Sequence, residues 1–147
     1  MPRRGKAILV AEPATLGAIL SDTTTRGIRI QARSEYEPER SSPAERYYFF
    51  SYRIRIENVG DQTAQLLSRL WVITDDRGEV THVEGPGVVG ETPVLAPGDA
   101  FEYTSFCPLP TPVGTMEGHY LMQAVPSGER FEARIEPFTL ALPGAVN

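Results

Sequence analysis

The chain has 147 residues, which is the size of one ordinary domain and enough to bury a hydrophobic core. Its 14 basic and 19 acidic residues give a formal net charge of -5, which argues against a general attraction to nucleic acid or to an anionic membrane. The single cysteine, Cys107, excludes an intrachain disulfide and zinc sites built from several thiolates, and it favours a reducing, cytoplasmic location.

The N-terminal segment begins with basic residues and the apolar run AILVA. Glu12 and Pro13 interrupt this run, whereas a secretory signal needs an uninterrupted apolar region. No run in the chain approaches the roughly 18 to 20 apolar residues of a membrane span. We therefore predict a poorly ordered tail over residues 1–21, one domain over residues 22–147 and no membrane partner.

From Thr25 onward, apolar and polar residues alternate with a period of two, which indicates strands with one buried face. Residues 28–31 and 101–104 show this alternation, and the segment LLSRLWVITD is predicted to form a central, largely buried strand. The clearest example is YYFFSYRIRIEN. Its predicted core positions are Tyr48, Phe50, Tyr52, Ile54 and Ile56.

Turn-forming residues separate these stretches at positions 58–61, 75–78, 96–99 and 126–129. About seven short strands without intervening helices predict an all-β fold, namely an antiparallel β-sandwich of the immunoglobulin or fibronectin type III kind. Near the C-terminus the apolar positions change from odd to even numbers at Pro137. Because proline cannot donate to a ladder, we expect a bulge or a change of sheet there.

The stretch GPGVVG has the spacing G-x-G-x-x-G at Gly85, Gly87 and Gly90, which in dinucleotide-binding enzymes seats a pyrophosphate at a helix N-terminus. Here the following residues, ETPVLAPGD, contain two prolines and do not begin a helix. We therefore predict a structural loop in which Gly87 has a positive φ and Val88 or Val89 points inward. A phosphate-binding loop and a partner-binding loop remain the alternatives.

Few residues are candidates for catalysis or metal binding. Cys107 with His82 or His119 is a conceivable thiolate pair, but none of them lies in a hydrolase motif, so no catalytic residue is predicted. His82 and Glu84 are two apart on one strand and share a face. With Glu91 they form a weak candidate site for a divalent cation, and no cofactor is predicted.

Several motifs occur together between residues 66 and 122: Arg69-x-Trp71, the GPGVVG loop, an APG turn, Tyr103-Thr104-Ser105, and the glycine, methionine and tyrosine pattern of GTMEGHY. With these motifs, residues 22–147 resemble the bacterial ApaG family and the ApaG domains of some eukaryotic F-box and polymerase-interacting proteins. The resemblance implies a fibronectin type III-like sandwich. The chain departs from the family pattern at Pro86, where the family commonly has an acidic or polar residue, and at Phe106, where it usually has glycine.

The resemblance also bears on function, because bacterial ApaG proteins are associated with cobalt and magnesium tolerance and the eukaryotic domains occur in adaptor-like proteins. We therefore predict a small, non-enzymatic interaction module with an unknown protein partner and a possible homodimer. The alternative is a binder of a phosphate, a pyrophosphate or a divalent cation through the GPGVVG loop.

Overall fold

The computed structural model describes residues 18–144, and nearly all regular structure in this part of the chain is β-strand. The predicted tail lies outside the described residues up to position 17, while Ser21, its last residue, begins the first strand. No helix in the described part is long and apolar enough to cross a membrane. The elements are β1 (Ser21–Thr25), β2 (Ile28–Tyr36), η1 (Pro38–Arg40), η2 (Pro43–Glu45), β3 (Tyr48–Asn58), β4 (Thr63–Asp75), β5 (Val80–Pro86), β6 (Val94–Leu95), β7 (Ala100–Leu109), β8 (Val113–Val125) and β9 (Arg130–Ala141).

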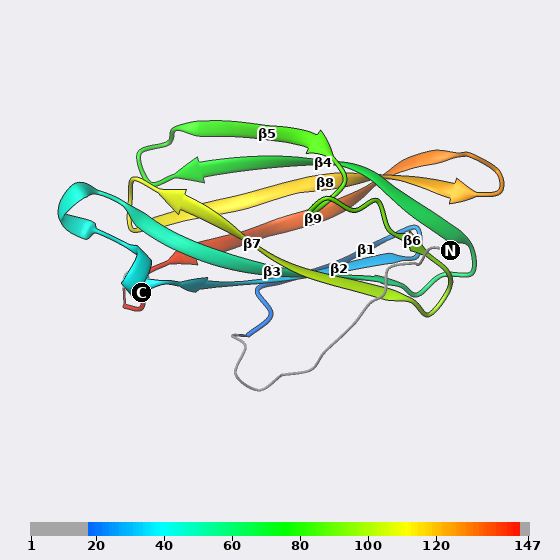
Figure 1. Ribbon diagram of the computed structural model, residues 1–147, viewed down its shortest axis with the longest axis horizontal. Coiled ribbons are helices and arrows are strands. Elements are labelled where there is room, and N and C mark those ends of the chain that lie inside the picture. The colour runs from blue at the N-terminus through cyan, green and yellow to red at the C-terminus, as the bar shows by residue number, and fades with distance from the viewer. Residues whose placement is uncertain (1–17, 145–147) are drawn as a thin grey trace.

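The strands form two antiparallel sheets that pack as a sandwich (Figure 1). One sheet has the order β1-β2-β3-β7, and the other has the order β5-β4-β8-β9, with β6 paired to β4. The predicted β-sandwich is confirmed. The described residues contain nine strands rather than about seven, because the polar β1 (SDTTT) and the two-residue β6 carry too little apolar pattern to be recognised.

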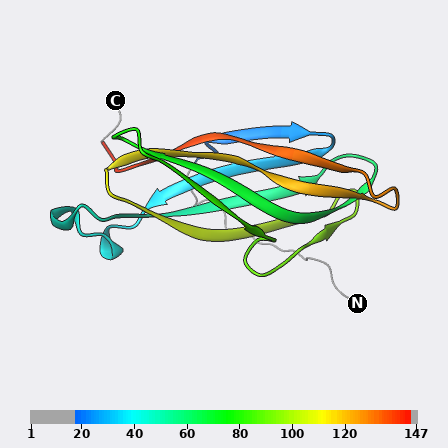
Figure 2. The ribbon, with the colours of Figure 1, turned by 90° about the horizontal axis from the view of Figure 1, so that it is seen from above.

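The two sides of the sandwich differ. On one side, β9 packs against β1 and β2 and closes the gap between the sheets. On the other side lie the edge strands β7 and β5, which within residues 18–144 make few contacts or none with each other (Figure 2). The molecule therefore has one closed and one open side.

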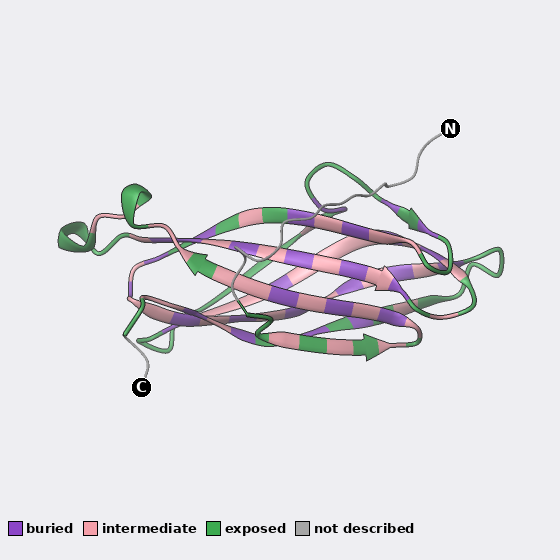
Figure 3. Cartoon of the chain, turned by 90° about the horizontal axis from the view of Figure 1, so that it is seen from below, coloured by how far each residue is buried: buried purple, intermediate pink, exposed green. Residues whose placement is uncertain are grey.

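The core lies between the sheets and follows the predicted alternation. Phe50, Ile54 and Ile56 have no exposed surface, and buried and half-buried residues alternate along the strands (Figure 3). Burying each large apolar side chain of this kind stabilises the fold by about 1.5–3 kcal/mol. The four predicted turn segments all connect consecutive strands, so they are confirmed.

Two β-bulges change which residues face the core. In β9, residues 136 and 137 together lie opposite the single residue 117, so the bulge expected at Pro137 is confirmed. In β4, Leu66 pairs with Met122 and Ser68 with Leu121, which leaves Leu67 as an extra residue. The segment LLSRLWVITD is central, as predicted, but not largely buried, because Leu67, Leu70 and Val72 keep partial exposure.

Candidate functional site

A cleft of about 380 Å³ opens between the sheets on the open side of the sandwich. It brings together residues from β3, β4, β7, the last residue of β5 and the loop that follows it. These residues are Tyr52, Arg69, Pro86, Val88, Val89, Gly90, Tyr103 and Ser105. The cleft therefore collects three of the sequence motifs, namely Arg69-x-Trp71, GPGVVG and Tyr103-Thr104-Ser105, which are far apart in the chain.

The loop that forms one wall is fixed by its own backbone. The Gly87 N–H donates to the Leu67 carbonyl at 2.8 Å, and Val88 and Glu91 exchange two backbone hydrogen bonds of 2.8 Å each. Gly87 has a φ of 60°, and a Cβ atom there would lie 2.3 Å from the Glu91 carbonyl oxygen. The predicted positive φ at Gly87 is confirmed.

The two valines of the loop point in opposite directions. Val88 is 1% exposed and belongs to the core, so the predicted inward anchor is confirmed for Val88. Val89 has a φ of 42° and is 54% exposed. A β-branched residue with positive φ is a strained outlier, and such strain is concentrated at functional sites. An exposed apolar side chain in a strained conformation therefore stands at the rim of the cleft.

Arg69 supplies the positive charge of the cleft. It pairs with Tyr120 of β8, so its side chain starts on the inner face of the sheet. Its Nη1 atom donates to the carbonyl oxygens of Pro86 and Gly87 at 3.0 and 2.9 Å, which ties β4 to the loop. Within residues 18–144, no carboxylate lies within 4.0 Å of this guanidinium group. The sequence shows Arg69 only as part of a motif and gives no sign that it faces inward.

The floor of the cleft is formed by tyrosines. Tyr103 and Tyr120 share a hydrogen bond between their hydroxyl groups, and Tyr52 packs edge-on against Tyr103. Burial raises the pKa of all three phenols above the ordinary value, while the Arg69 guanidinium lowers it slightly. All three tyrosines therefore stay neutral at physiological pH; Tyr52 and Tyr103 line the cleft, whereas Tyr120 is fully buried.

The residues considered for catalysis do not form a reactive pair. Cys107 is buried on the inner face of β7, and burial raises the pKa of its thiol to about 11. His119 pairs with Leu70 in the opposite sheet, and its ring lies 3.5 Å from a Glu132 carboxylate oxygen. The thiol is thus neutral at pH 7, whereas the nucleophilic form of cysteine is the thiolate.

The three metal candidates are only partly brought together. His82 and Glu84 lie opposite Val72 and Leu70 on the outer face of the sheet, so they share a face as expected. Glu91 lies in the loop and pairs with Val88 through its backbone. Among residues 18–144, no three histidine, cysteine or carboxylate side chains are grouped to hold a metal ion.

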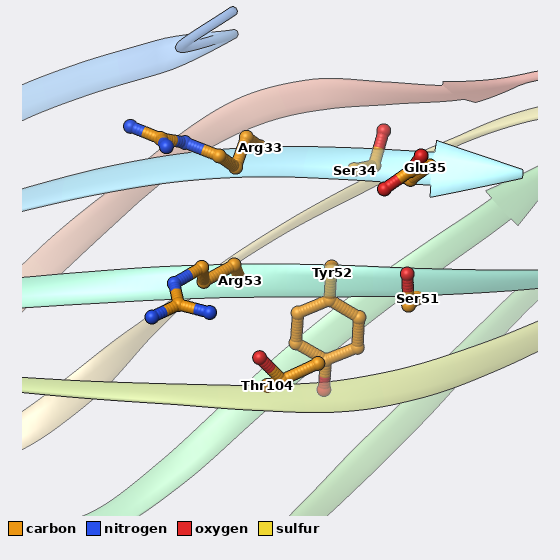
Figure 4. Close-up of a pocket in the computed structure, with 7 residues that line it drawn as sticks. All are labelled: Arg33, Ser34, Glu35, Ser51, Tyr52, Arg53 and Thr104. Carbon is orange, nitrogen blue, oxygen red and sulfur yellow. The ribbon is translucent and has the colours of Figure 1, made fainter. Parts of the chain in front are cut away.

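A second hollow, of about 170 Å³, lies on the outer face of the four-stranded sheet (Figure 4). Arg33 and Arg53 stand directly opposite each other there, on β2 and β3. Glu35 also lines the hollow, and Glu102 binds Arg53 at 2.9 Å, so its charges are mixed. Thr104 of β7 lies on this side, whereas Tyr52 reaches across behind it toward β7. Strand β7 therefore separates the outer hollow from the cleft.

Comparison with known proteins matches most of this chain to one family. The ApaG domain family matches residues 38–124. A Protein ApaG from Rhodospirillum centenum is 55% identical over 119 residues, which is 81% of this chain and 91% of the relative. A Protein ApaG from a Shewanella species is 51% identical over 82% of this chain and 94% of its own length. A solved structure from Bordetella pertussis is 44% identical, with a TM-score of 0.78 over 86% of this chain and 99% of that one.

The loop geometry predicts different costs for two glycine substitutions. Gly87→Ala and Gly90→Ala each place a Cβ at a positive φ, which costs about 1–2 kcal/mol of unfolding free energy. At Gly87 the new methyl group also meets the Glu91 carbonyl, whereas Gly90 faces open space. We expect Gly87→Ala to cost at least about 1 kcal/mol more than Gly90→Ala. Urea denaturation measures the difference, and equal losses would contradict the crowded loop.

As a control, replacing the Glu84 and Glu91 side chains by alanine is expected to change stability by less than about 0.5 kcal/mol each.

Proposed function

The chain belongs to the ApaG domain family, and we propose that it is a non-enzymatic protein-interaction module that contacts its partner at the cleft. The observation that carries this proposal is Val89, an apolar side chain held exposed in a strained conformation at the cleft rim. Strain of this kind persists only where the surroundings fix it, and it costs about 1–3 kcal/mol. A functional contact made by this side chain explains why such a cost is kept.

The chemistry of the cleft supports binding rather than reaction. Its lining offers neutral hydroxyl groups, a guanidinium group and apolar surface. A rim of mixed polar and apolar groups around a preformed hollow is typical of a recognition site. We further propose that the protein works in the cytoplasm, where Cys107 stays reduced, and that any effect on cobalt or magnesium tolerance acts through the partner.

Val89→Asn separates the stability of the loop from partner binding. Asparagine accepts a positive φ more readily than valine, so this variant is expected to keep its unfolding free energy or to gain up to about 1 kcal/mol. It also removes the apolar side chain from the rim. In quantitative affinity capture from the native cytosol, the partner should be retained by the unchanged protein and lost from Val89→Asn. Val59→Asn, at a similarly exposed valine in a turn away from the cleft, serves as the control. A capture profile identical for all three proteins would contradict the proposal.

The alternative function is binding of a phosphate, a pyrophosphate or a divalent cation at Gly85, Gly87 and Gly90. Arg69 favours it, because a cation lies beside the loop. The backbone N–H groups of Gly87 and Val88 oppose it, because they already donate within the chain. We expect calorimetric titrations with pyrophosphate, Mg²⁺ and Co²⁺ to give no binding heat. Saturable heat with pyrophosphate that disappears in Arg69→Gln would establish the alternative instead.

We also propose a homodimer that forms along β5. Six of the seven residues of this edge strand are exposed, including Val80 and Val83 at 51% and 38%. Exposed, apolar edge strands are templates for pairing with another chain. Light scattering at about 50 µM protein should give the mass of a dimer, as expected for a Kd near 10 µM or below. Val83→Lys should give a monomer, and a monomer for the unchanged chain would refute this assembly.

A further inference from the structure

Within residues 18–144, strand β7 leaves a row of backbone groups without partners on the open side. In this part of the chain it is the last strand of its sheet and pairs only with β3. In the same register, the Asn58 N–H donates to the Asp99 carbonyl at 2.9 Å. Because hydrogen-bonded and non-bonded pairs alternate in an antiparallel ladder, the odd-numbered residues of β7 bond to β3. The even-numbered residues Glu102, Thr104 and Phe106 therefore direct their N–H and C=O groups away from the sheet.

The position of Pro108 agrees with this alternation of residues that bond to β3 and residues that face away from it. Proline has no N–H and is tolerated in an edge strand only where that group would face away from the ladder. Pro108 has the same parity as the three open residues, and it lies opposite Phe49. Pro108 therefore offers no N–H group at this edge. Over residues 102–106, no hydrogen bond from the described residues reaches the outward N–H and C=O groups.

We propose that this edge binds an extended, acidic segment of the partner protein, which adds to the sheet as a strand beside β7. The proposal rests on the interaction function above and names the kind of partner. Along an added strand, alternate side chains point to opposite faces. One set enters the cleft beside Tyr103 and Ser105, and the other lies over the outer face beside Thr104.

The charge of the cleft selects the partner chemistry. Arg69 uses Nη1 for the two loop carbonyls, while no described hydrogen bond occupies its Nε and Nη2 atoms. None of the residues that line the cleft carries a carboxylate. A half-buried guanidinium group without a counter-charge forms a strong, charge-assisted hydrogen bond to a carboxylate. The inward side chain of the partner is therefore an aspartate or a glutamate.

A second copy of this chain fits the edge less well. In a symmetric pairing of two β7 strands, the side chains that enter the opposite cleft come from the odd-numbered residues. These are Phe101, Tyr103, Ser105, Cys107 and Leu109, and none is acidic. The pairing would leave Arg69 without a carboxylate, so the segment is assigned to a different protein.

The test uses random twelve-residue peptides displayed on phage and selected on the full chain. We expect the selected peptides to share an acidic residue and to lose at least about tenfold in affinity when that residue becomes glutamine. On binding, amide exchange should slow at Glu102, Thr104 and Phe106 but stay unchanged at Tyr103 and Ser105, which already donate to β3. Selected peptides that lack an acidic residue would overturn the proposal. Unchanged exchange at all three outward amides would overturn it as well.

Thr104→Pro isolates the edge from the cleft. It removes one outward N–H without removing a ladder bond, so the variant should fold and lose peptide binding at least about tenfold. The control is Val59→Asn, in the turn away from residues 102–106 of β7 and from the cleft, which should bind like the unchanged protein. Peptides that still bind Thr104→Pro but not Val89→Asn would refute strand addition and keep the cleft as the contact site. Peptides that bind all variants equally would refute both.

Discussion

A single extra residue in β4, Leu67, determines where the cleft lies and what lines it. Before the bulge, the inward positions of β4 are Ala64 and Leu66, and after it they are Arg69 and Trp71. If Leu67 were paired regularly instead of being bulged, Arg69 would face the solvent and the indole of Trp71 would leave the core. A one-residue change of phase reverses the face of every later side chain in a strand, which is why bulges are placed beside functional sites. The bulge region also holds the loop, because the Leu67 carbonyl accepts the Gly87 N–H and the Leu66 N–H donates to the Pro93 carbonyl. Residues 88–92 are therefore held as an excursion at the edge of β4, opposite β7.

Most of the fold could be predicted from the sequence, because alternation and turn chemistry are local signals. Pro137 reveals its bulge, since the apolar positions change parity there and a proline marks the place. Leu67 gives no such signal: in LLSRLWVITD, apolar residues stand at both parities, so the change of phase is hidden. The polar β1 is likewise fixed by its pairing with β2 and by packing against β9, not by its own pattern.

The site was predictable only in part, for the same reason. The loop conformation at Gly87 and the anchoring of Val88 follow from the glycine spacing and the prolines after it. The inward position of Arg69 does not, because it depends on the hidden bulge. The meeting of Arg69 with Tyr103 and Ser105 joins residues of the two sheets, and no local pattern reports which edges stay open. Phe106, which departs from the family pattern, lies in an ordinary extended strand, stacked on Phe49 with Arg40 over both rings.

The loop keeps Val89 exposed because its neighbours more than offset the strain. Burying Val88 stabilises the folded loop by about 1.5–3 kcal/mol, comparable with the cost of a β-branched residue at positive φ. The bonds from Arg69 to two loop carbonyls and the paired bonds between Val88 and Glu91 add to this, so the loop does not relax by turning Val89 inward. A rim fixed in this way is ordered before a partner arrives, and binding there does not need to order the loop. On the facing side, β7 is held by its full ladder with β3, so each wall of the cleft is hydrogen-bonded to its own sheet. The arrangement therefore suits recognition of a segment that is itself extended and flexible, since the ordering cost then falls on the partner alone.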